Sequence, residues 1–219
     1  MNFNRHLVKN SKYGHYSKVT HPIDHEKFPL FTKAVSTDIE LKAGEYMYIP
    51  GKCWHWIVSQ GRCVSVNFWF ENSTLGDVPF CRPFKTDVLW SDEYIANICK
   101  DKPIAIWATK PDLIKHMNFQ TFVNDGHKEQ CYFNTVSGYE FIPTNKFVLD
   151  ALMPEIKRIQ MSVNAPRDAV PNFWMNYGNV DSGLHYDDYS GILCLLEGTK
   201  QIKLYDANQS EYLYPHRIS

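Results

Sequence analysis

Short strand-like segments recur near both ends of this chain and limit its fold more than any other feature. They alternate in polarity or are apolar throughout, and turn residues separate them. The clearest are residues 37–41, 46–50 and 64–70 in the first part and residues 172–177, 183–187, 192–196 and 201–205 in the last part. The sequence therefore predicts a mainly β fold, with residues 197–200 as a hairpin turn between the last two strands.

The middle of the chain has a more helical pattern. The expected helices are residues 91–100, 118–123 and 146–159, and the expected short strands are residues 103–109 and 129–135. The third helix has an apolar face that Pro154 interrupts. Helices are thus expected as an addition between the two groups of strands.

Composition narrows the class of protein. At 219 residues the chain suits one domain, or one sheet domain with a helical extension. The net charge of −1 gives no general attraction to polyanions, which disfavours a nucleic-acid partner. No apolar run reaches the ~18–20 residues that cross a bilayer, and the start lacks the apolar core of a secretory signal. We therefore expect an intracellular protein, cytoplasmic or nuclear, with no membrane partner.

The cysteines and the polar N-terminal residues add little chemistry by themselves. Six cysteines are scattered without a CxxC pair, and several lie in apolar runs, which is typical of reduced, buried thiols. A disulfide framework is the less favoured alternative. Residues 1–27 are polar and hold four of the nine histidines. A solvated surface loop is favoured there over an accessory metal role.

The first candidate site is the pair His185 and Asp187. Residues two apart on a strand point to the same face, so the imidazole and the carboxylate would converge. One nitrogen and one hard oxygen suit Fe(II), which binds two histidines and one carboxylate and keeps three positions open. The pair alone is a weak signal, and a satisfied polar pair near a sheet edge is the alternative.

Lys200 strengthens the case for a site. It lies fifteen residues after His185, and alternation places it on one face with Ile202 and Leu204. Such a lysine either extends its amine to the barrel rim or lines a buried cavity. In the second case it must meet an anion, because an unpaired buried ammonium is costly.

The third candidate is His55, which lies between Trp54 and Trp56 after a Pro-Gly turn. A lone histidine in such a setting is usually structural. The longer segments favour a ligand, because residues 41–50, 54–55 and 66–69 closely resemble the C-terminal half of JmjC-type, cupin-like hydroxylases. Residues 183–215 resemble the preceding part of that family, and residues 129–133 resemble an earlier strand. The resemblance spans about 28–70 and 83–215 and implies a double-stranded β-helix, the jelly-roll or cupin fold.

The resemblance also implies a set of site residues. His185, Asp187 and His55 would be the ligands of Fe(II), and Lys200 would pair with the C5 carboxylate of 2-oxoglutarate. The supporting contacts to this cosubstrate would be Tyr132, Ser182 and Asn67, and Trp69 would pack beneath the site. Tyr132 and Trp69 as ordinary core aromatics are the alternative. The chain departs from the family at Gly191, where relatives often have asparagine, and so lacks one polar contact to the cosubstrate.

The order of these motifs is inverted relative to the family, in which the HxD pair precedes the distal histidine. A circular permutation accounts for the inversion. Joining the two ends would place about 87 residues between Asp187 and His55, a separation typical of the family. Residues 28–71 would then be the C-terminal half of the barrel and residues 84–219 its N-terminal half with helices. The polar loop 1–27 would precede them, and residues 72–83 would connect them.

Two other origins of the inverted order are open. His55 of one chain would complete the site of another in a domain-swapped homo-oligomer, although a connector of this length allows closure within one chain. A truncated or spliced set of fragments is less favoured, because both halves are complete and their ends join in register.

The activity implied by the resemblance is an Fe(II)- and 2-oxoglutarate-dependent oxygenase that hydroxylates a protein or peptide side chain. Alternatives within the superfamily are an N-methyl-lysine demethylase and a hydroxylase of tRNA bases. A catalytically silent cupin module that binds a partner is the alternative from another class. The retention of all three ligands and of Lys200 disfavours it.

Overall fold

The computed structural model describes residues 15–71, 75–108, 114–135 and 145–216. In chain order its elements are η2 (Pro29–Lys33), β1 (Thr37–Lys42), β2 (Glu45–Ile49), β3 (Trp54–Phe70), β4 (Phe80–Pro83), α1 (Asp92–Cys99), β5 (Ile104–Ala108), β6 (Ile114–Met117), α2 (Phe119–Glu129), β7 (Cys131–Asn134), α3 (Lys146–Ser162), β8 (Val170–Asn176), β9 (Val180–His185), β10 (Ser190–Tyr205) and η4 (Ala207–Tyr212). The mainly β fold with helices in the middle of the chain is confirmed.

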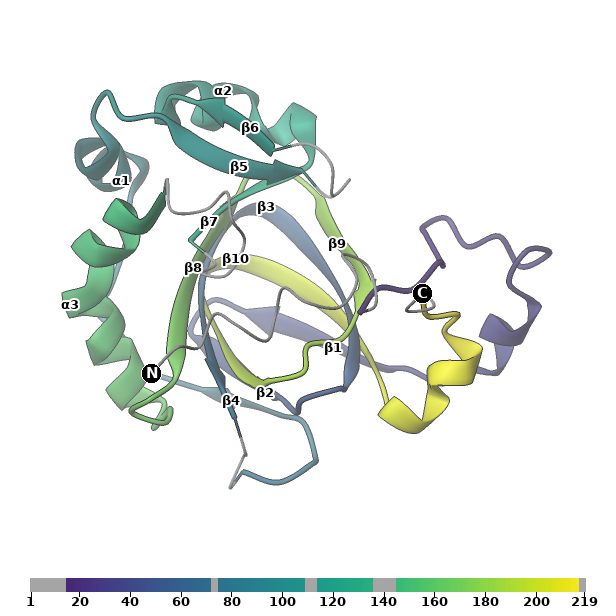
Figure 1. The fold of residues 1–219 in the computed structure, drawn as a ribbon. Helices are drawn as coiled ribbons and strands as arrows, with labels where there is room; N and C mark the ends of the chain where they lie inside the picture. The colour runs from purple at the N-terminus through teal and green to yellow at the C-terminus, as the bar shows by residue number, and fades with distance from the viewer. Residues whose placement is uncertain (1–14, 72–74, 109–113, 136–144, 217–219) are drawn as a thin grey trace.

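The strands form one antiparallel sheet that curls on itself (Figure 1). Their order is β4-β2-β10-β3-β8-β7-β5-β6, with β1 added to β10 and β9 added to β3. The two long strands, β3 and β10, pair with each other over nearly their whole length and carry strands from both ends of the chain. This is the jelly-roll architecture expected from the resemblance.

The three helices lie on the outer side of β8, β7 and β5 (Figure 1). Helix α1 begins at Ser91, whose hydroxyl accepts the Tyr94 N–H, and α2 begins at Asn118, which caps Thr121 in the same way. The helices bury the alternate, apolar residues of the sheet. This largest core contains Val64, Val66, Phe68, Ile106, Phe133, Phe173 and Met175 from the strands and Ile95, Phe122, Leu152 and Ile156 from the helices.

Helix α3 continues through Pro154, so the expected interruption at this residue is wrong. A proline inside a helix removes one hydrogen bond and costs about 3 kcal/mol. The apolar face of α3 is fully buried before and after the proline, at Val148, Leu152, Ile156 and Ile159. Burial of four such side chains, at roughly 1.5–3 kcal/mol each, outweighs the cost and keeps the helix continuous.

The hairpin expected at residues 197–200 is also wrong, because β10 is one continuous strand. Its partner β3 runs beside both of its halves, and bulges between Leu195 and Thr199 absorb the change of register. Gly198 allows β3 and β10 to approach each other closely at these bulges. A Cβ at Gly198 would lie 2.4 Å from the carbonyl oxygen of Arg62. The glycine therefore indicated a bulge at the bend and not a turn.

Two residues in the described part of the N-terminal loop are packed. Ser17 and Val19 are only 8% and 2% exposed, so the solvated surface loop is wrong for these two residues, whereas residues 20–22 and 24–27 are exposed. Tyr16 pairs with His185, and Ser17 pairs with Pro215. Residues from both ends of the chain thus lie side by side, as a permuted barrel requires. The permuted order and the boundaries of the two halves stay predictions.

The six cysteines are free thiols, five of them buried and Cys81 exposed, as reduced buried thiols were expected to be. None of the helices in the described parts of the chain is long and apolar enough to cross a membrane.

Candidate metal centre

Strand pairing brings two of the predicted ligands together. His55 at the start of β3 is the direct partner of His185 at the end of β9. Their ring centroids are 4.3 Å apart, in an edge-to-face arrangement. The two histidines are 130 positions apart in the chain, and only the antiparallel ladder makes them neighbours. Both lie in one chain, and exchange of strands between chains stays a prediction.

Asp187 joins them from the loop that follows β9. Its Oδ2 lies 3.8 Å from His55 Nε2, and the candidate ligand atoms of the three residues all lie within 4.8 Å of one another. The loop is held in place because the Lys52 N–H donates to the Asp187 carbonyl at 2.6 Å. Gly51 permits this contact, since a Cβ there would lie 2.8 Å from the Asp188 carbonyl oxygen. The Pro-Gly turn before His55 therefore helps to place Asp187 as well.

Hydrogen bonds determine which nitrogen of each histidine is free. His55 Nδ1 lies 3.0 Å from the Cys53 carbonyl, and His185 Nδ1 lies 2.9 Å from the Gly183 carbonyl. A carbonyl oxygen only accepts, so Nδ1 carries the proton in both rings. Each Nε2 is left with a lone pair, which is the form in which histidine binds metals.

The electrostatics of the cluster suit a cation. Removal from water lowers the pKa of His55 and of His185 to about 4, so both imidazoles are neutral near pH 7. Burial also raises the pKa of the Asp187 carboxyl. Two neutral nitrogens and one carboxylate oxygen on one side of a site match the facial triad of non-haem Fe(II). The residues present therefore fit such an ion.

Lys200 lies on the same interior surface, farther along the barrel. It is 4% exposed and shares its face with the buried Ile202 and Leu204, so its amine does not extend into water at the barrel rim. Its Nζ donates to Ser59 Oγ at 2.7 Å. Within the described residues no carboxylate forms an ion pair with it, and burial lowers its pKa to about 8. A buried amine in this state fits a carboxylate ligand.

Tyr132 reaches the same region from β7. Its ring lies 5.9 Å below Lys200 Nζ, and its hydroxyl donates to the Val180 carbonyl at 3.2 Å. Burial raises its pKa, so the phenol stays protonated and remains a donor. Ser59, which was not among the predicted site residues, accepts a hydrogen bond from Lys200 and offsets a part of the rise in the pKa of Tyr132 that burial causes. Its alternation with His55 on one strand was the signal that could have identified it.

The interior face of β3 and β8 carries polar atoms without partners. Asn67 Oδ1, Ser65 Oγ and Asn172 Oδ1 are all buried and have no hydrogen-bond partner among the described residues. Asn67 pairs with Asn172 across the two strands, and Ser65 is two residues from Asn67. Such atoms cost about 1–3 kcal/mol each if nothing binds them, so the surface fits a polar ligand. Ser65 and Asn172 are additions to the predicted site.

Gly191 lies against two side chains of the interior face of β3. A Cβ at Gly191 would lie 3.1 Å from Asn67 Oδ1 and 3.2 Å from a ring carbon of Trp69, so a larger residue would have to displace them. The glycine therefore permits the close approach of Asn67 and Trp69 to β10. Trp69 pairs with Gly191 across β3 and β10 and is partly buried, and its packing beneath the metal site stays a prediction.

Ser182 has its hydroxyl engaged by the backbone. It donates to the Gly183 carbonyl at 3.1 Å and accepts the Ile57 N–H at 3.1 Å, at the irregular part of the β3–β9 pairing. The hydroxyl proton of Ser182 is thus already used in a hydrogen bond within the protein. A contact from Ser182 to a cosubstrate stays a prediction.

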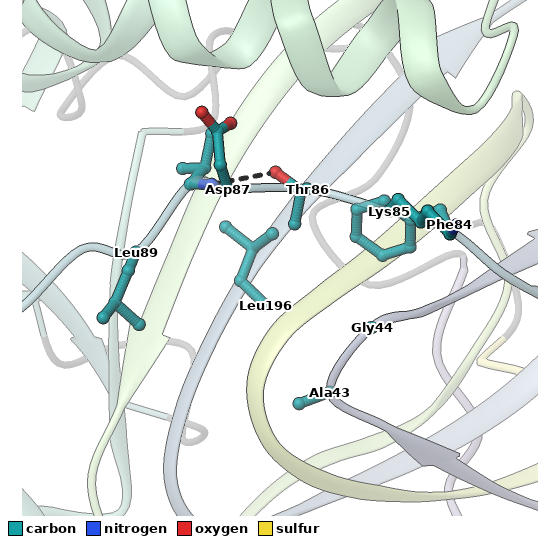
Figure 2. A pocket seen from close by; sticks show the side chains of 9 residues that line it. Ala43, Gly44, Phe84, Lys85, Thr86, Asp87, Leu89 and Leu196 are labelled. Atoms are coloured by element: carbon teal, nitrogen blue, oxygen red, sulfur yellow. Dashed lines mark hydrogen bonds between the residues drawn. The ribbon is translucent and has the colours of Figure 1, made fainter.

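A separate shallow hollow lies near the turn between β1 and β2 (Figure 2). Phe84, Val88, Leu89 and Leu196 are among its apolar lining residues, and Lys85 and Asp87 also line it. None of the predicted site residues lines this hollow.

Comparison with known proteins agrees with the cupin-like class of protein that the jelly-roll fold indicates. The profile of the cupin-like domain family matches residues 6–75 and 108–219. The chain therefore belongs to the cupin-like domain family, and the expected JmjC-like cupin is confirmed.

The similar proteins carry JmjC names. The chain is 28% identical over 252 residues to the putative JmjC domain-containing protein L887 of Acanthamoeba polyphaga mimivirus, covering 97% of this chain and 41% of that protein. It is 28% identical over 150 residues to JmjC domain-containing protein D of Dictyostelium discoideum, covering 58% of this chain and 33% of that protein. A shorter match, 41% identical over 47 residues, covers 22% of this chain and 9% of lysine-specific demethylase JMJ31 of Arabidopsis thaliana.

This chain thus spans less than half the length of these relatives. No solved structure matches it.

Proposed function

We propose that this chain is an Fe(II)- and 2-oxoglutarate-dependent oxygenase that hydroxylates a side chain of a protein or peptide. The observation that carries the proposal is the convergence of His55, His185 and Asp187, with both Nε2 atoms free, on the interior that also holds the buried Lys200. The family supports an oxygenase of this superfamily. The hydroxylation of a peptide is the finer part of the proposal.

Different residues of the site would bind the metal and the cosubstrate. His55, His185 and Asp187 would hold Fe(II) on one side, which leaves positions for the oxoacid and for O₂. Lys200, with Ser59 and Tyr132 beside it, would bind the distal carboxylate of 2-oxoglutarate, and Asn67 would contact its other end. Once bound, the iron and the oxoacid supply the oxidising chemistry, with decarboxylation to succinate. The barrel orients both groups and excludes water.

Three alternative functions differ in how well the sequence supports them. Demethylation of N-methyl-lysine uses the same hydroxylation on an N-methyl carbon, and a short segment resembles a protein named a lysine-specific demethylase. Hydroxylation of a tRNA base is less favoured because the net charge is −1. A silent binding module would be free to lose ligands, and this chain keeps all three and the lysine.

The test is anaerobic titration of the protein with Fe(II) and 2-oxoglutarate. An intact site should produce a metal-to-ligand charge-transfer band, and Asp187→Ala should abolish it. Asp188→Ala, the exposed neighbour, is the matched control and should keep the band. Absence of a band in the unmodified chain would contradict the oxygenase proposal. Succinate release, with a mass-spectrometric search for peptides that gain one oxygen atom, then tests the substrate class.

Sharing of the site between chains has its own experiment. The variants Asp187→Ala and His55→Ala are each expected to be inactive. Mixing them restores activity only if one chain completes the site of another. The convergence of all three residues within one chain predicts no restoration.

A further inference from the structure

A short segment of the predicted N-terminal loop lies beside the candidate metal centre. Residues 15–19, here named the strap, lie along the free edge of β9. The Ser17 N–H donates to the Leu184 carbonyl at 2.8 Å, and the Tyr186 N–H donates to the His15 carbonyl at 3.0 Å. The strap therefore extends the sheet at the strand that carries His185.

The other edge of the strap is held as well. The Lys18 N–H donates to the Tyr214 carbonyl, and the His216 N–H donates to the Tyr16 carbonyl, both at 2.9 Å. The Ser17 hydroxyl donates to the Leu213 carbonyl, and Val19 is buried among the aromatic residues outside the barrel. These contacts on both sides place the strap in a defined position against the site.

This position brings the Tyr16 ring onto a candidate metal ligand. Tyr16 pairs with His185, so the two side chains lie on the same face of the sheet. Their rings are stacked, with centroids 5.0 Å apart and an angle of 19° between their planes. Gly183 leaves space beside the stack, since a Cβ there would lie 3.7 Å from two carbons of the Tyr16 ring.

The two histidines differ in how the protein holds them. His55 is 3% exposed and is enclosed by the barrel. His185 is partly exposed and lies at the end of a strand near the edge of the sheet. Its Nδ1 hydrogen bond to the Gly183 carbonyl restrains one edge of the ring, and the His55 ring lies edge-to-face with it. Tyr16 stacks on a face of the His185 ring.

We propose that Tyr16 is a positioning residue for the metal centre: its ring fixes the plane of the His185 imidazole and shields it from water. The inference rests on the proposed metal-binding function. Contacts that orient a metal-ligating histidine typically change metal affinity about 10–100-fold when they are removed. The stack uses the ring and not the hydroxyl, so phenylalanine should replace tyrosine at this position.

The first measurement needs no metal. In the metal-free protein with isotope-labelled histidine, stacking on Tyr16 shifts the ring protons of His185 by its ring current. Tyr16→Ala should remove this shift and Tyr16→Phe should keep it. Tyr189→Ala, a nearby and partly buried tyrosine, is the matched control and should leave the shift unchanged. Loss of the shift in Tyr16→Phe would overturn the stacking.

The second measurement is metal affinity, by calorimetric titration with Mn(II) or Co(II) in place of the oxygen-sensitive iron. Tyr16→Ala should bind about 10–100-fold more weakly, while Tyr16→Phe and Tyr189→Ala should bind within about twofold of the unmodified chain. Tyr16→Leu keeps the bulk without the aromatic ring. Tyr16→Leu should bind the metal as weakly as Tyr16→Ala does. It replaces Tyr16→Ala in the experiment if the alanine variant does not fold.

The outcomes separate this inference from the proposed function. Unchanged affinity in Tyr16→Ala, with normal binding by the unmodified chain, overturns the role of Tyr16 and leaves the metal centre intact. Weak binding in both Tyr16→Ala and Tyr16→Phe assigns the effect to the hydroxyl and overturns the stacking mechanism. No binding by the unmodified chain overturns the metal centre and with it the role of Tyr16, whatever the ring shift shows.

Discussion

The two faces of β3 and β8 are built from neighbouring residues and have opposite character. On the outer face, Val66, Phe68 and Phe173 are fully buried under the helices, and Phe173 makes edge-to-face contacts with Phe133 and Trp90. On the inner face, Ser65 and Asn67 have buried oxygen atoms without partners. The outer face stabilises the fold, and the inner face keeps polar groups that only a ligand would satisfy.

The residues that stabilise the fold and the residues available to bind a ligand are therefore on opposite faces of the same strands. Buried apolar area on the outer face contributes roughly 25 cal/mol per Å². Each unsatisfied polar atom on the inner face costs about 1–3 kcal/mol. The helix-covered core thus offsets the cost of a polar barrel interior. Substitutions on the two faces should therefore have effects of opposite kind.

The largest effect is expected on the outer face. Phe173→Ala removes a fully buried ring and should lower the free energy of unfolding by about 3–5 kcal/mol, as measured by urea denaturation. The folded fraction should bind Mn(II) and 2-oxoglutarate as the unmodified chain does. A large loss of binding in the folded fraction would show that the two faces are not independent.

A substitution on the inner face, at Lys200, should raise the free energy of unfolding. The pKa of Lys200 is lowered from 10.5 to about 8 by burial, so at pH 7 the fold disfavours its charged form by roughly 3 kcal/mol. Lys200→Met removes this cost and the bond to Ser59, and it should raise the free energy of unfolding by about 1–3 kcal/mol at pH 7. The gain should shrink between pH 8 and 10.5, where the unfolded chain binds the proton and the folded chain does not.

Binding gives the second half of this test. Lys200→Met should weaken the binding of 2-oxoglutarate about tenfold to a hundredfold while Mn(II) still binds. A variant that is less stable than the unmodified chain, or that binds the oxoacid equally well, would contradict the role of Lys200 as an amine buried for an anion.

The affinity for 2-oxoglutarate should also depend on pH. Below about pH 8 the amine of Lys200 is protonated and pairs with the carboxylate, and above it the charge is lost. The dissociation constant should be level below pH 8 and then rise about tenfold per pH unit, which calorimetry measures. In Lys200→Met the dependence should be absent. A level affinity from pH 7 to 10 in the unmodified chain would exclude Lys200 as the partner of the carboxylate.

The smallest effect is expected from a pair of neighbours on opposite faces. Ser65→Ala removes an unsatisfied hydroxyl and should change the free energy of unfolding by about 1 kcal/mol or less, in the stabilising direction. Val66→Ala, one residue away, should destabilise by about 2 kcal/mol. Thermal and urea unfolding of both variants compare the faces directly. Equal destabilisation by the two would remove the distinction between them.

Much of the fold could be predicted from local pattern. Alternation identified most strands of both ends, but it missed the first half of β3, and β4 lies in the segment 72–83 that was predicted as a connector. The predicted starts of two helices, at residues 91 and 118, agree with the N-caps Ser91 and Asn118. The errors occurred where packing outweighs local preference. Local preference predicts that Pro154 interrupts a helix that burial of its apolar face maintains, and it predicts a turn at Gly198, although close approach to Arg62 requires this glycine.

The candidate site was predictable only in part. His185 and Asp187 are two residues apart, and the prediction that one strand carries both is wrong, because β9 ends at His185. Asp187 reaches the cluster from the following loop, which the hydrogen bond from the Lys52 N–H holds in place. The place of His55 came from the resemblance, and the structure adds its pairing with His185. Ser59 and Asn172 carry no motif and could be found only by their positions on the interior face. Tyr16 lay in a segment without periodicity, so nothing local connected it to the metal centre.

Most strands, the apolar faces that the helices cover and the chemical types of the ligand side chains follow from local sequence, because they depend on periods of two and 3.6 and on side-chain chemistry. Only the tertiary structure decided that His55 faces His185, that Lys200 is buried without a carboxylate partner among the described residues, and that Tyr16 lies on the ring of His185. The reason is that strand pairing joins residues more than a hundred positions apart. Such contacts depend on the register of the whole sheet and leave no mark in the neighbouring sequence.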